Sequence, residues 1–362
     1  MGRRRRVLKG LAAAGLAPVW RPATLLAGEP IAQTRFADVN SNLVTDYASP
    51  RFNTFAEAAH KQAEILVAYD QGDATLEDAK SAFHDAIGAW MKVQHLRFGA
   101  AEEQMRDFRI QFWPDKRNRV GKQLGEAMRE ERQDLLDPEV LADASVALQG
   151  FPALERLVFV EEVAPGSYGG ALAVAVGNNL ASMTDAIAGA WAPAGATGAA
   201  LLSPGSGARY SDPAAVTAAF VGAMAVQLEF IAQRKLSTPL GESLEKARPR
   251  TSETWRSGGS LTHIATNLTS LSDMYGGGDR IGALVVEAGF EQVSENLQVA
   301  MAEALANTQA LGADLPPLVE EEAGREQLEQ IVAKVETAHG LVAGDIAGAL
   351  DLVLGFNSLD GD

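Results

Sequence analysis

The sequence places a histidine three residues after a glutamate at two points, Glu57–His60 and Glu336–His339, with Glu64 one turn beyond the first pair. Residues i and i+3 project from one face of a helix, and helical bundles that hold two iron ions use Glu-x-x-His pairs in this way. Such bundles also need a lone glutamate from each of two further helices. Because glutamate is common in this chain, chance matches on solvated helix faces are the alternative interpretation.

A further candidate carboxylate, Glu155, lies in the segment Gln149–Phe159, which reads QGFPALERLVF. Gly150 is suited to end a preceding helix, and Pro152 to the first turn of the next, where its missing N–H costs nothing. Glu155 then lies close to the positive end of the helix dipole, which favours the anionic form and predicts a lowered pKa. The segment therefore predicts two helices joined at Gly150, with an acid near the start of the second.

Patterns typical of several other active sites are missing from the sequence. His-Glu-x-x-His does not occur, which disfavours a zincin-type protease, and Gly-x-Ser-x-Gly does not occur either. The glycine-rich run MYGGGDR lacks the lysine and the preceding strand of a phosphate-binding loop. The chain has no cysteine, so it forms neither a thiolate metal site nor a disulfide. A Ser/His/Asp triad stays open from the sequence alone.

The chain is acidic, with 31 basic and 47 acidic side chains and a net charge of −16 at pH 7. Its first 28 residues hold six of the basic side chains and no acidic one, so the remainder carries −22. A body of this charge is repelled by phosphate backbones and anionic lipid, which argues against nucleic acid as a partner. The same field favours cations and partners with basic patches.

Residues 1–28 have the pattern of an export signal. The basic run RRRRVLKG precedes the apolar run LAAAGLAPVW, and small residues around Ala27 offer a cleavage site. Residues 4–9 fit R-R-x-V-L-K, which is similar to the twin-arginine consensus; an arginine-rich general secretory signal is the alternative. No later segment is expected to span a membrane, because the best candidate, residues 170–192, contains two asparagines and an aspartate. We expect a soluble periplasmic protein.

Helical periodicity runs through nearly the whole chain, and no alternating strand pattern bounded by hairpin turns occurs. The sequence therefore predicts an all-α fold of two packed helical bundles, residues 29–165 and residues 166–362. The stretch Pro193–Gly207, rich in Gly, Pro, Ser and Ala, predicts a mobile loop, and residues 236–251 predict an irregular crossover. The expected helices span residues 52–69, 76–98, 118–132, 138–149, 171–191, 213–235, 252–274, 281–311 and 318–354.

Four segments in this order resemble the imelysin family of bacterial envelope proteins: GFPALERLVF, the loop FWPD, the run TWRSGGSLTHIATNL and the C-terminal GFNSLDGD. The resemblance spans residues 40–362 and is closest to a branch described as predicted periplasmic lipoproteins, although this chain lacks the cysteine that would carry the lipid. It implies two helical bundles in one chain. The family signature is Gly-x-His-x-x-Glu, proposed as a metal or peptidase site. Gly150 and Glu155 match it, whereas Pro152 stands at the histidine position and has no lone pair for a metal.

The resemblance also implies a cleft between the bundles that other polar side chains share with Glu155. The implied cleft residues are Glu155, Arg97, Trp113, Asp115, Arg256, Ser257, Asn357, Asp360 and Asp362. The arginines either pair with Glu155 as a buried network or bind an anionic ligand through paired N–H groups. The acidic tail is expected to dock against the body, with carboxylates available to a divalent or ferric cation. Glu57 and His60 would join Glu155 at a metal only if the fold brings them together.

From the resemblance we expect a non-enzymatic periplasmic protein that binds a metal ion or a small molecule and serves iron or other metal acquisition. An imelysin-type envelope peptidase is the first alternative, which Pro152 weakens because zinc hydrolysis needs three protein ligands and an open position. The second alternative is a protein-interaction module without a metal site, which receives another envelope protein through Pro193–Gly207.

Overall fold

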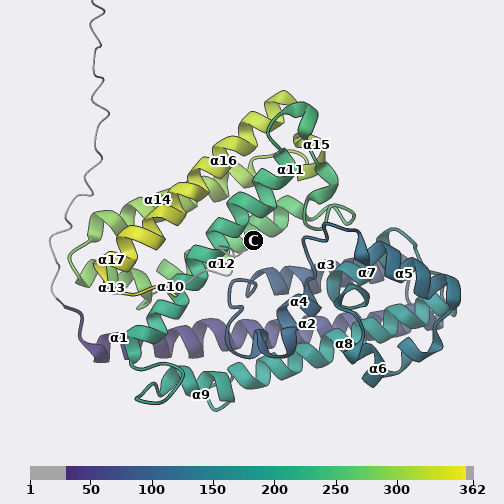
Figure 1. Ribbon diagram of the computed structural model, residues 1–362, viewed down its shortest axis with the longest axis horizontal. Coiled ribbons are helices and arrows are strands. Elements are labelled where there is room, and N and C mark those ends of the chain that lie inside the picture. The colour runs from purple at the N-terminus through teal and green to yellow at the C-terminus, as the bar shows by residue number, and fades with distance from the viewer. Residues whose placement is uncertain (1–29, 277, 356–362) are drawn as a thin grey trace, which may run out of the picture.

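The computed structural model describes residues 30–276 and 278–355, and every element below lies in those ranges. Within them the protein is helical and has no strand, which confirms the predicted all-α fold. Figure 1 shows two groups of helices that lie against each other, one coloured purple to teal and the other green to yellow. The export signal and the acidic tail predicted from the sequence lie outside the described residues.

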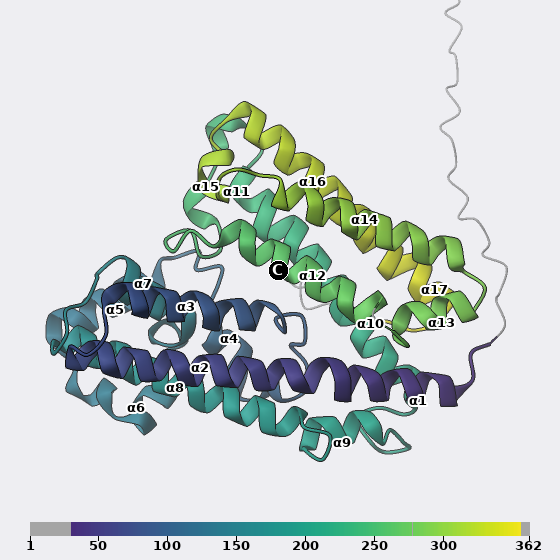
Figure 2. The same ribbon diagram turned by 180° about the vertical axis from the view of Figure 1, so that it is seen from behind.

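The first bundle is built on α2 (Ser49–Gln71), α3 (Leu76–Met91), α7 (Gly150–Phe159) and α8 (Tyr168–Trp191). Four further helices complete it: α4 (Arg106–Ile110), α5 (Arg119–Glu130), α6 (Pro138–Asp143) and α9 (Ala196–Leu202). We expected the division between the bundles near residues 165 and 166, but α8 follows that point and packs along α2 (Figure 2). The two helices approach closely, since a Cβ at Gly177 of α8 would lie 2.8 Å from Leu66 Cδ1 of α2. The first bundle therefore extends through α9.

The second bundle is built on α10 (Pro213–Glu229), α12 (Ser260–Gly276), α14 (Glu291–Gln309) and α16 (Glu322–Gly340). Its shorter helices are α11 (Thr238–Leu240), α13 (Ile281–Glu287), α15 (Leu315–Leu318) and α17 (Ala347–Ala349). Helix α1 (Gln33–Asn42) packs on α10, and a π-helical turn, Leu43–Ala48, joins it to α2 of the first bundle. One long helical run thus contacts both bundles (Figure 2).

The segment Pro213–Leu240 forms one continuous helix, because α10 continues through a π-helical turn, Phe230–Ser237, into α11. By length and composition it could cross a membrane, which corrects the expectation that no segment after the signal is apolar enough. However, 67% of its most apolar window is buried inside the protein, where α10 packs on α1 and α16. Its hydropathy is therefore accounted for by its place in the core of the second bundle.

Polar caps start two helices where the sequence predicts them. Asp137 accepts hydrogen bonds from the first N–H groups of α6, with Pro138 at the first position, and Asp212 does the same for α10. At both sites a short acidic side chain precedes proline, so the local signal alone determines the start of the helix.

Several other boundaries differ from the prediction. Helix α6 ends at Asp143 instead of continuing to residue 149, and α12 starts at Ser260 instead of residue 252. The helix expected over residues 281–311 is interrupted at Gly289, whose φ of +87° is a left-handed conformation that ends α13. The expected mobile loop Pro193–Gly207 instead contains α9, so seven of its residues are helical.

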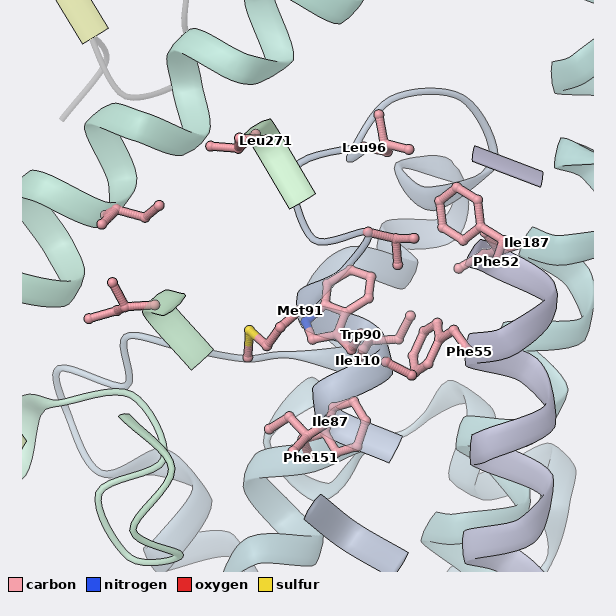
Figure 3. Packing of buried hydrophobic residues seen from close by; sticks show 14 of the residues in the cluster. Phe52, Phe55, Ile87, Trp90, Met91, Leu96, Ile110, Phe151, Ile187 and Leu271 are labelled. Carbon is pink, nitrogen blue, oxygen red and sulfur yellow. The ribbon is translucent and has the colours of Figure 1, made fainter. Parts of the chain in front are cut away.

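Aromatic packing fixes α7 in the first bundle. Phe151, in the first turn of α7, lies 6.2 Å from Phe55 of α2 and 5.7 Å from Phe83 of α3, measured between ring centroids. Figure 3 shows Phe151 close to Ile87 in this packed region, with Trp90 beside Phe55. Phe151 is almost wholly buried, so its packing fixes the direction of α7. Glu155, one turn later in the same helix, is positioned by that direction.

Candidate ligand-binding cleft

Gly150 makes the joint in QGFPALERLVF possible. Its φ is +65°, and a Cβ at this position would overlap the backbone carbonyl oxygens of Arg109 and Ile110, so the site requires glycine. The predicted joint is confirmed, but the preceding turn is a short 3₁₀ segment, Val146–Leu148, rather than the end of a long helix. Helix α7 already begins at Gly150, so Glu155 lies in its second turn and not at its start.

Glu155 is buried, with 4% of its surface exposed, and its carboxylate accepts four hydrogen bonds. Oε1 accepts from Ser257 Oγ at 2.9 Å, from the Ser257 N–H at 3.0 Å and from the Arg256 N–H at 3.2 Å. Oε2 accepts from Arg256 Nη1 at 3.4 Å. Of the two roles left open for the arginines, Arg256 takes the first, as a partner of Glu155. The sequence-predicted residues Glu155, Arg256 and Ser257 therefore do come together.

Burial raises the pKa of Glu155, and the charge of Arg256 and the hydrogen bonds from Ser257 oppose that rise only in part. This corrects the expectation of a lowered pKa. The helix dipole lowers the pKa of acids mainly in the first turn, and Glu155 lies in the second turn. Burial removes water from the whole carboxylate and raises its pKa.

The loop FWPD faces the same cleft. Trp113 packs edge-on against Phe230, with 5.6 Å between ring centroids, and Arg97 packs on the same ring at 4.9 Å. Asp115 lines the cleft, but both its oxygens bind backbone N–H groups at the start of α5: Arg119 at 2.8 Å and Val120 at 2.9 Å. Asp115 is therefore an N-terminal cap. Arg97 does not line the cleft, and it shares the neighbour Phe230 with Trp113.

The opposite wall is the segment Glu253–Ser257, which is held in a strained conformation. Thr254 has a φ of +53°, which is rare for a β-branched residue, and its hydroxyl lies 2.9 Å from Nδ1 of the buried His263. Glu155 holds one end of the segment and Lys235, through Glu253, holds the other. Such strain persists only where the surroundings over-determine the backbone, and it is typical of ligand-binding walls.

Between these walls lies a cleft of about 400 Å³, which we call the basic cleft. Its lining comes from the FWPD loop, the start of α7, the π-helical turn and the crossover that follows, so both bundles contribute. Its aromatic lining side chains are Phe112, Trp113, Phe151 and Trp255. Its charged lining side chains are Lys116, Arg234, Arg248, Arg250, Arg256, Asp115 and Glu155. Five positive charges face two negative ones in a chain whose net charge is −16.

Of these five cations, the motifs in the sequence predict only Arg256 as a cleft residue. Arg248 and Arg250 belong to the run KARPRT, from which the sequence predicts only an irregular crossover, and Lys116 follows the FWPD motif directly. A basic run beside a tryptophan in an otherwise acidic chain was the available signal. Arg250 and Arg256 both lie against Trp255, at 5.8 Å and 4.4 Å from its ring centroid.

The candidate metal residues do not form one site. His60 Nε2 lies 2.9 Å from Asp185 Oδ1 on the exposed surface between α2 and α8, and Glu57 is likewise exposed on α2. Glu155 is engaged by Arg256 and Ser257 instead. Across residues 30–276 and 278–355, no group of three or more His, Cys, Asp or Glu side chains could hold a metal ion. Asn357, Asp360 and Asp362 lie outside the described residues.

A bare cation does not suit the surroundings of Glu155. Every group that contacts its carboxylate is a hydrogen-bond donor, and one of them carries a positive charge. A metal ion needs lone pairs from several ligands, and the adjacent Pro152 has none to give. The donor set therefore fits a carboxylate that stabilises the protein and does not fit a metal ligand.

A second and more open hollow, of about 860 Å³, lies along α12 and the end of α14. Arg51 and Asp273, two of its charged side chains, pair with each other at 3.0 Å. Of the family-like segments within the described residues, TWRSGGSLTHIATNL alone reaches it. The basic cleft, in which the FWPD, GFPALER and TWRSG segments converge, is the better candidate site.

Comparisons with known proteins agree with this architecture. The sequence model of a family described as imelysin, peptidase M75, matches residues 42–342. Comparison with curated proteins gives no match. The structure is similar to that of an imelysin-like protein from Psychrobacter arcticum 273-4, with a TM-score of 0.75 and 17% identity, covering 92% of this chain and 100% of that one. It is also similar to a "putative iron-regulated protein A precursor" from Parabacteroides distasonis ATCC 8503, with a TM-score of 0.69 and 15% identity, covering 87% and 96%.

Proposed function

We propose, from the premise that the chain belongs to the imelysin family, that it is a binding protein that holds a small organic anion in the basic cleft between its two bundles. The observation that carries this proposal is the reversal of charge. The cleft has a surplus of three positive charges in a chain that is strongly negative as a whole. Charges of one sign that line a cleft focus its field, so they attract an anion more strongly than single charges on an open surface do.

The shape and composition of the cleft support a ligand with a carbon body. Ligand sites are concave and mostly apolar, with a few polar groups that orient the ligand. Here aromatic side chains from both walls, Trp113 and Trp255, stand beside the arginines. Arginine binds carboxylates through two parallel N–H groups, so Arg248 and Arg250 are suited to an anionic headgroup.

An iron-related role fits this proposal if the metal enters as part of an anionic complex. One structural neighbour is described as iron-regulated, and imelysin proteins are generally exported. We therefore propose that the mature protein acts in the periplasm, after cleavage near Ala27, and captures its ligand there in the service of metal acquisition. In this account the metal is cargo and none of the lining side chains needs to coordinate it.

Peptidase activity is not part of the proposal. Pro152 stands where the family signature has histidine, and Glu155, which a hydrolytic site would need as a base or ligand, is occupied by four donors. The interaction-module alternative relied on a mobile loop at Pro193–Gly207, and that stretch contains the helix α9.

Calorimetric titration tests the proposal. Succinate, and separately Zn²⁺ and Fe³⁺ salts, are titrated into the mature chain and into Arg250→Gln. We expect succinate to bind and Arg250→Gln to weaken it about tenfold, the effect of one lost charge-assisted pair. Arg129→Gln is the matched control, because Arg129 is 70% exposed in the last turn of α5 and does not line the cleft. Stoichiometric binding of the metal ions without any binding of succinate would overturn the proposal.

A further inference from the structure

We infer that the ligand of the basic cleft is a compact polycarboxylate, an organic molecule with at least two carboxylate groups. This inference rests on the proposed function and goes beyond it, since the proposal would also hold for a ligand with a single negative charge. The cations of the cleft lie on separate segments, and several of them have no acidic partner within the described part of the chain, so they favour a ligand with more than one negative charge.

The two carboxylates in the lining are not available to neutralise the free cations. Glu155 is committed to Arg256 and Ser257, and Asp115 is committed to the backbone at the start of α5. Among the residues that the structure describes, none of the ion pairs involves Lys116, Arg248 or Arg250, and all three are exposed at the cleft. These three side chains therefore present charge that a ligand can neutralise.

The free cations also come from separate segments. Lys116 follows the FWPD loop of the first bundle, whereas Arg248 and Arg250 flank Pro249 in the crossover of the second. A guanidinium that binds a carboxylate through two parallel N–H groups engages both of its oxygens, so that carboxylate faces the wall that holds the guanidinium. A ligand that engages both walls of the cleft therefore needs an anionic group at each end, and a monocarboxylate leaves one wall without a partner.

The volume and the aromatic lining limit the size and nature of the ligand. A volume of about 400 Å³ lies at the small end of the range of ligand pockets, about 300–1,000 Å³, which suits a compact acid. Inorganic phosphate would satisfy the arginines but would leave Trp113 and Trp255 uncovered. Polycarboxylates also bind hard cations through oxygen, so a ferric complex of such an acid would keep a negative charge for the cleft and carry the metal on its far side.

A charge series tests this inference at constant chemistry: acetate, succinate and propane-1,2,3-tricarboxylate, titrated by calorimetry at low and at physiological salt. We expect the affinity to rise by about tenfold for each added carboxylate at low salt and by less at physiological salt, because exposed charges are screened. The double variant Arg248→Gln/Arg250→Gln should lose about 30-fold or more for the tricarboxylate and about threefold for acetate. Both arginines are exposed, so the variant keeps the core intact, and Arg129→Gln is again the control.

The outcomes separate this inference from the proposed function. Equal affinity for acetate and the tricarboxylate would overturn the polycarboxylate and leave an anion-binding cleft. Inorganic phosphate that binds more tightly than the tricarboxylate would overturn the organic ligand. No binding by any member of the series would overturn both. The ferric tricarboxylate complex is the last arm: binding at least as tight as that of the metal-free acid supports a metal-bearing cargo, and exclusion of the complex would overturn it.

Discussion

The ammonium nitrogen of Lys235 lies 2.6 Å from Oε2 of Glu253, and both side chains are almost wholly buried. The same ammonium donates to Gln94 Oε1 at 2.7 Å, in the turn after α3, and to Asn267 Oδ1 of α12 at 2.5 Å. One buried cation thus joins the first bundle, the second bundle and the wall of the basic cleft. Although burial alone would raise the pKa of Glu253, the charge and hydrogen bond of Lys235 hold it below its usual range.

Removing one partner of this pair is expected to cost more than removing both. Glu253→Gln leaves the Lys235 charge buried without its counter-ion, and such a change destabilises proteins by about 3–5 kcal/mol. In the double variant Lys235→Met/Glu253→Gln no charge remains, so we expect it to recover at least half of that loss. Urea unfolding of the three proteins measures this. A double variant less stable than Glu253→Gln would show that the buried charge is not what costs the single variant its stability.

Glu155 distinguishes an anion site from a metal site. Glu155→Gln keeps the shape and the acceptor for Ser257 but removes one negative charge from the wall of the cleft. We expect succinate to bind about three- to tenfold more tightly, since the repulsion between the ligand and the carboxylate is lost. Titration of succinate into Glu155→Gln and into Glu130→Gln measures this effect. Glu130 is an exposed acidic residue at the end of α5, so its variant controls for the loss of one negative charge elsewhere. If Glu155 instead coordinates a metal ion, Glu155→Gln should lose both the metal ion and the binding of succinate.

Gly150 should tolerate no side chain. In Gly150→Ala the new Cβ meets the carbonyl oxygens of Arg109 and Ile110 at a positive φ, and we expect a loss of about 2–4 kcal/mol in the free energy of unfolding. Gly125→Ala is the matched control. Gly125 lies inside α5 with open space around its Cβ position, so alanine should stabilise the protein by up to about 1 kcal/mol. Equal unfolding midpoints for the two variants would contradict the geometry described for the α7 joint.

Stability should fall as the pH drops from about 6.5 to about 4, because two buried histidines are held neutral. Burial lowers the pKa of His95 to about 3, and burial likewise lowers the pKa of His263 to about 4. Both pKa values lie below the histidine pKa of the unfolded chain, about 6.5, so the unfolded state binds more protons between pH 6.5 and pH 4. At pH 4 this proton binding lowers the free energy of unfolding by about 3 kcal/mol per histidine. The stabilisation is complete above pH 6.5.

A variant isolates this effect from the titration of carboxylates. His95→Gln should flatten the dependence of unfolding free energy on pH between 6.5 and 4 relative to the parent protein. The Tyr47 hydroxyl donates to Ser270 O, so His95 Nε2 is the donor to Tyr47 and the ring has no need of a second proton. Parallel pH profiles for the parent and His95→Gln would refute the neutral histidine.

Local sequence signals predicted much of the fold. Asp137 and Asp212 before proline gave correct helix starts, and the match to the imelysin family over residues 42–342 confirms the resemblance stated from the motifs. The predicted meeting of Glu155 with Arg256 and Ser257 is also found. The helix starts depend on residues next to each other in the chain, and the other features depend on short sequence motifs. Both kinds of signal are visible in the sequence.

The positive charge of the basic cleft could not be predicted from the sequence. Lys116 and Arg250 are 134 positions apart in the sequence, and only the packing of the two bundles brings them to one cavity. The raised pKa of Glu155 has the same origin, since its burial depends on a wall from the second bundle and not on the helix dipole of α7. The net charge of −16 pointed towards cations, but it describes the whole surface and not this cleft.

The location of a bound anion tests the central claim most directly. Crystals of the mature protein soaked in 2-bromosuccinate and measured at the bromine absorption edge would show the acid by its anomalous signal. We predict a bromine peak inside the basic cleft, in contact with Trp255 and within reach of Arg248 and Arg250. A cleft without bromine, at an acid concentration that saturates binding in solution, would contradict the account, because the anion would then bind elsewhere on the molecule.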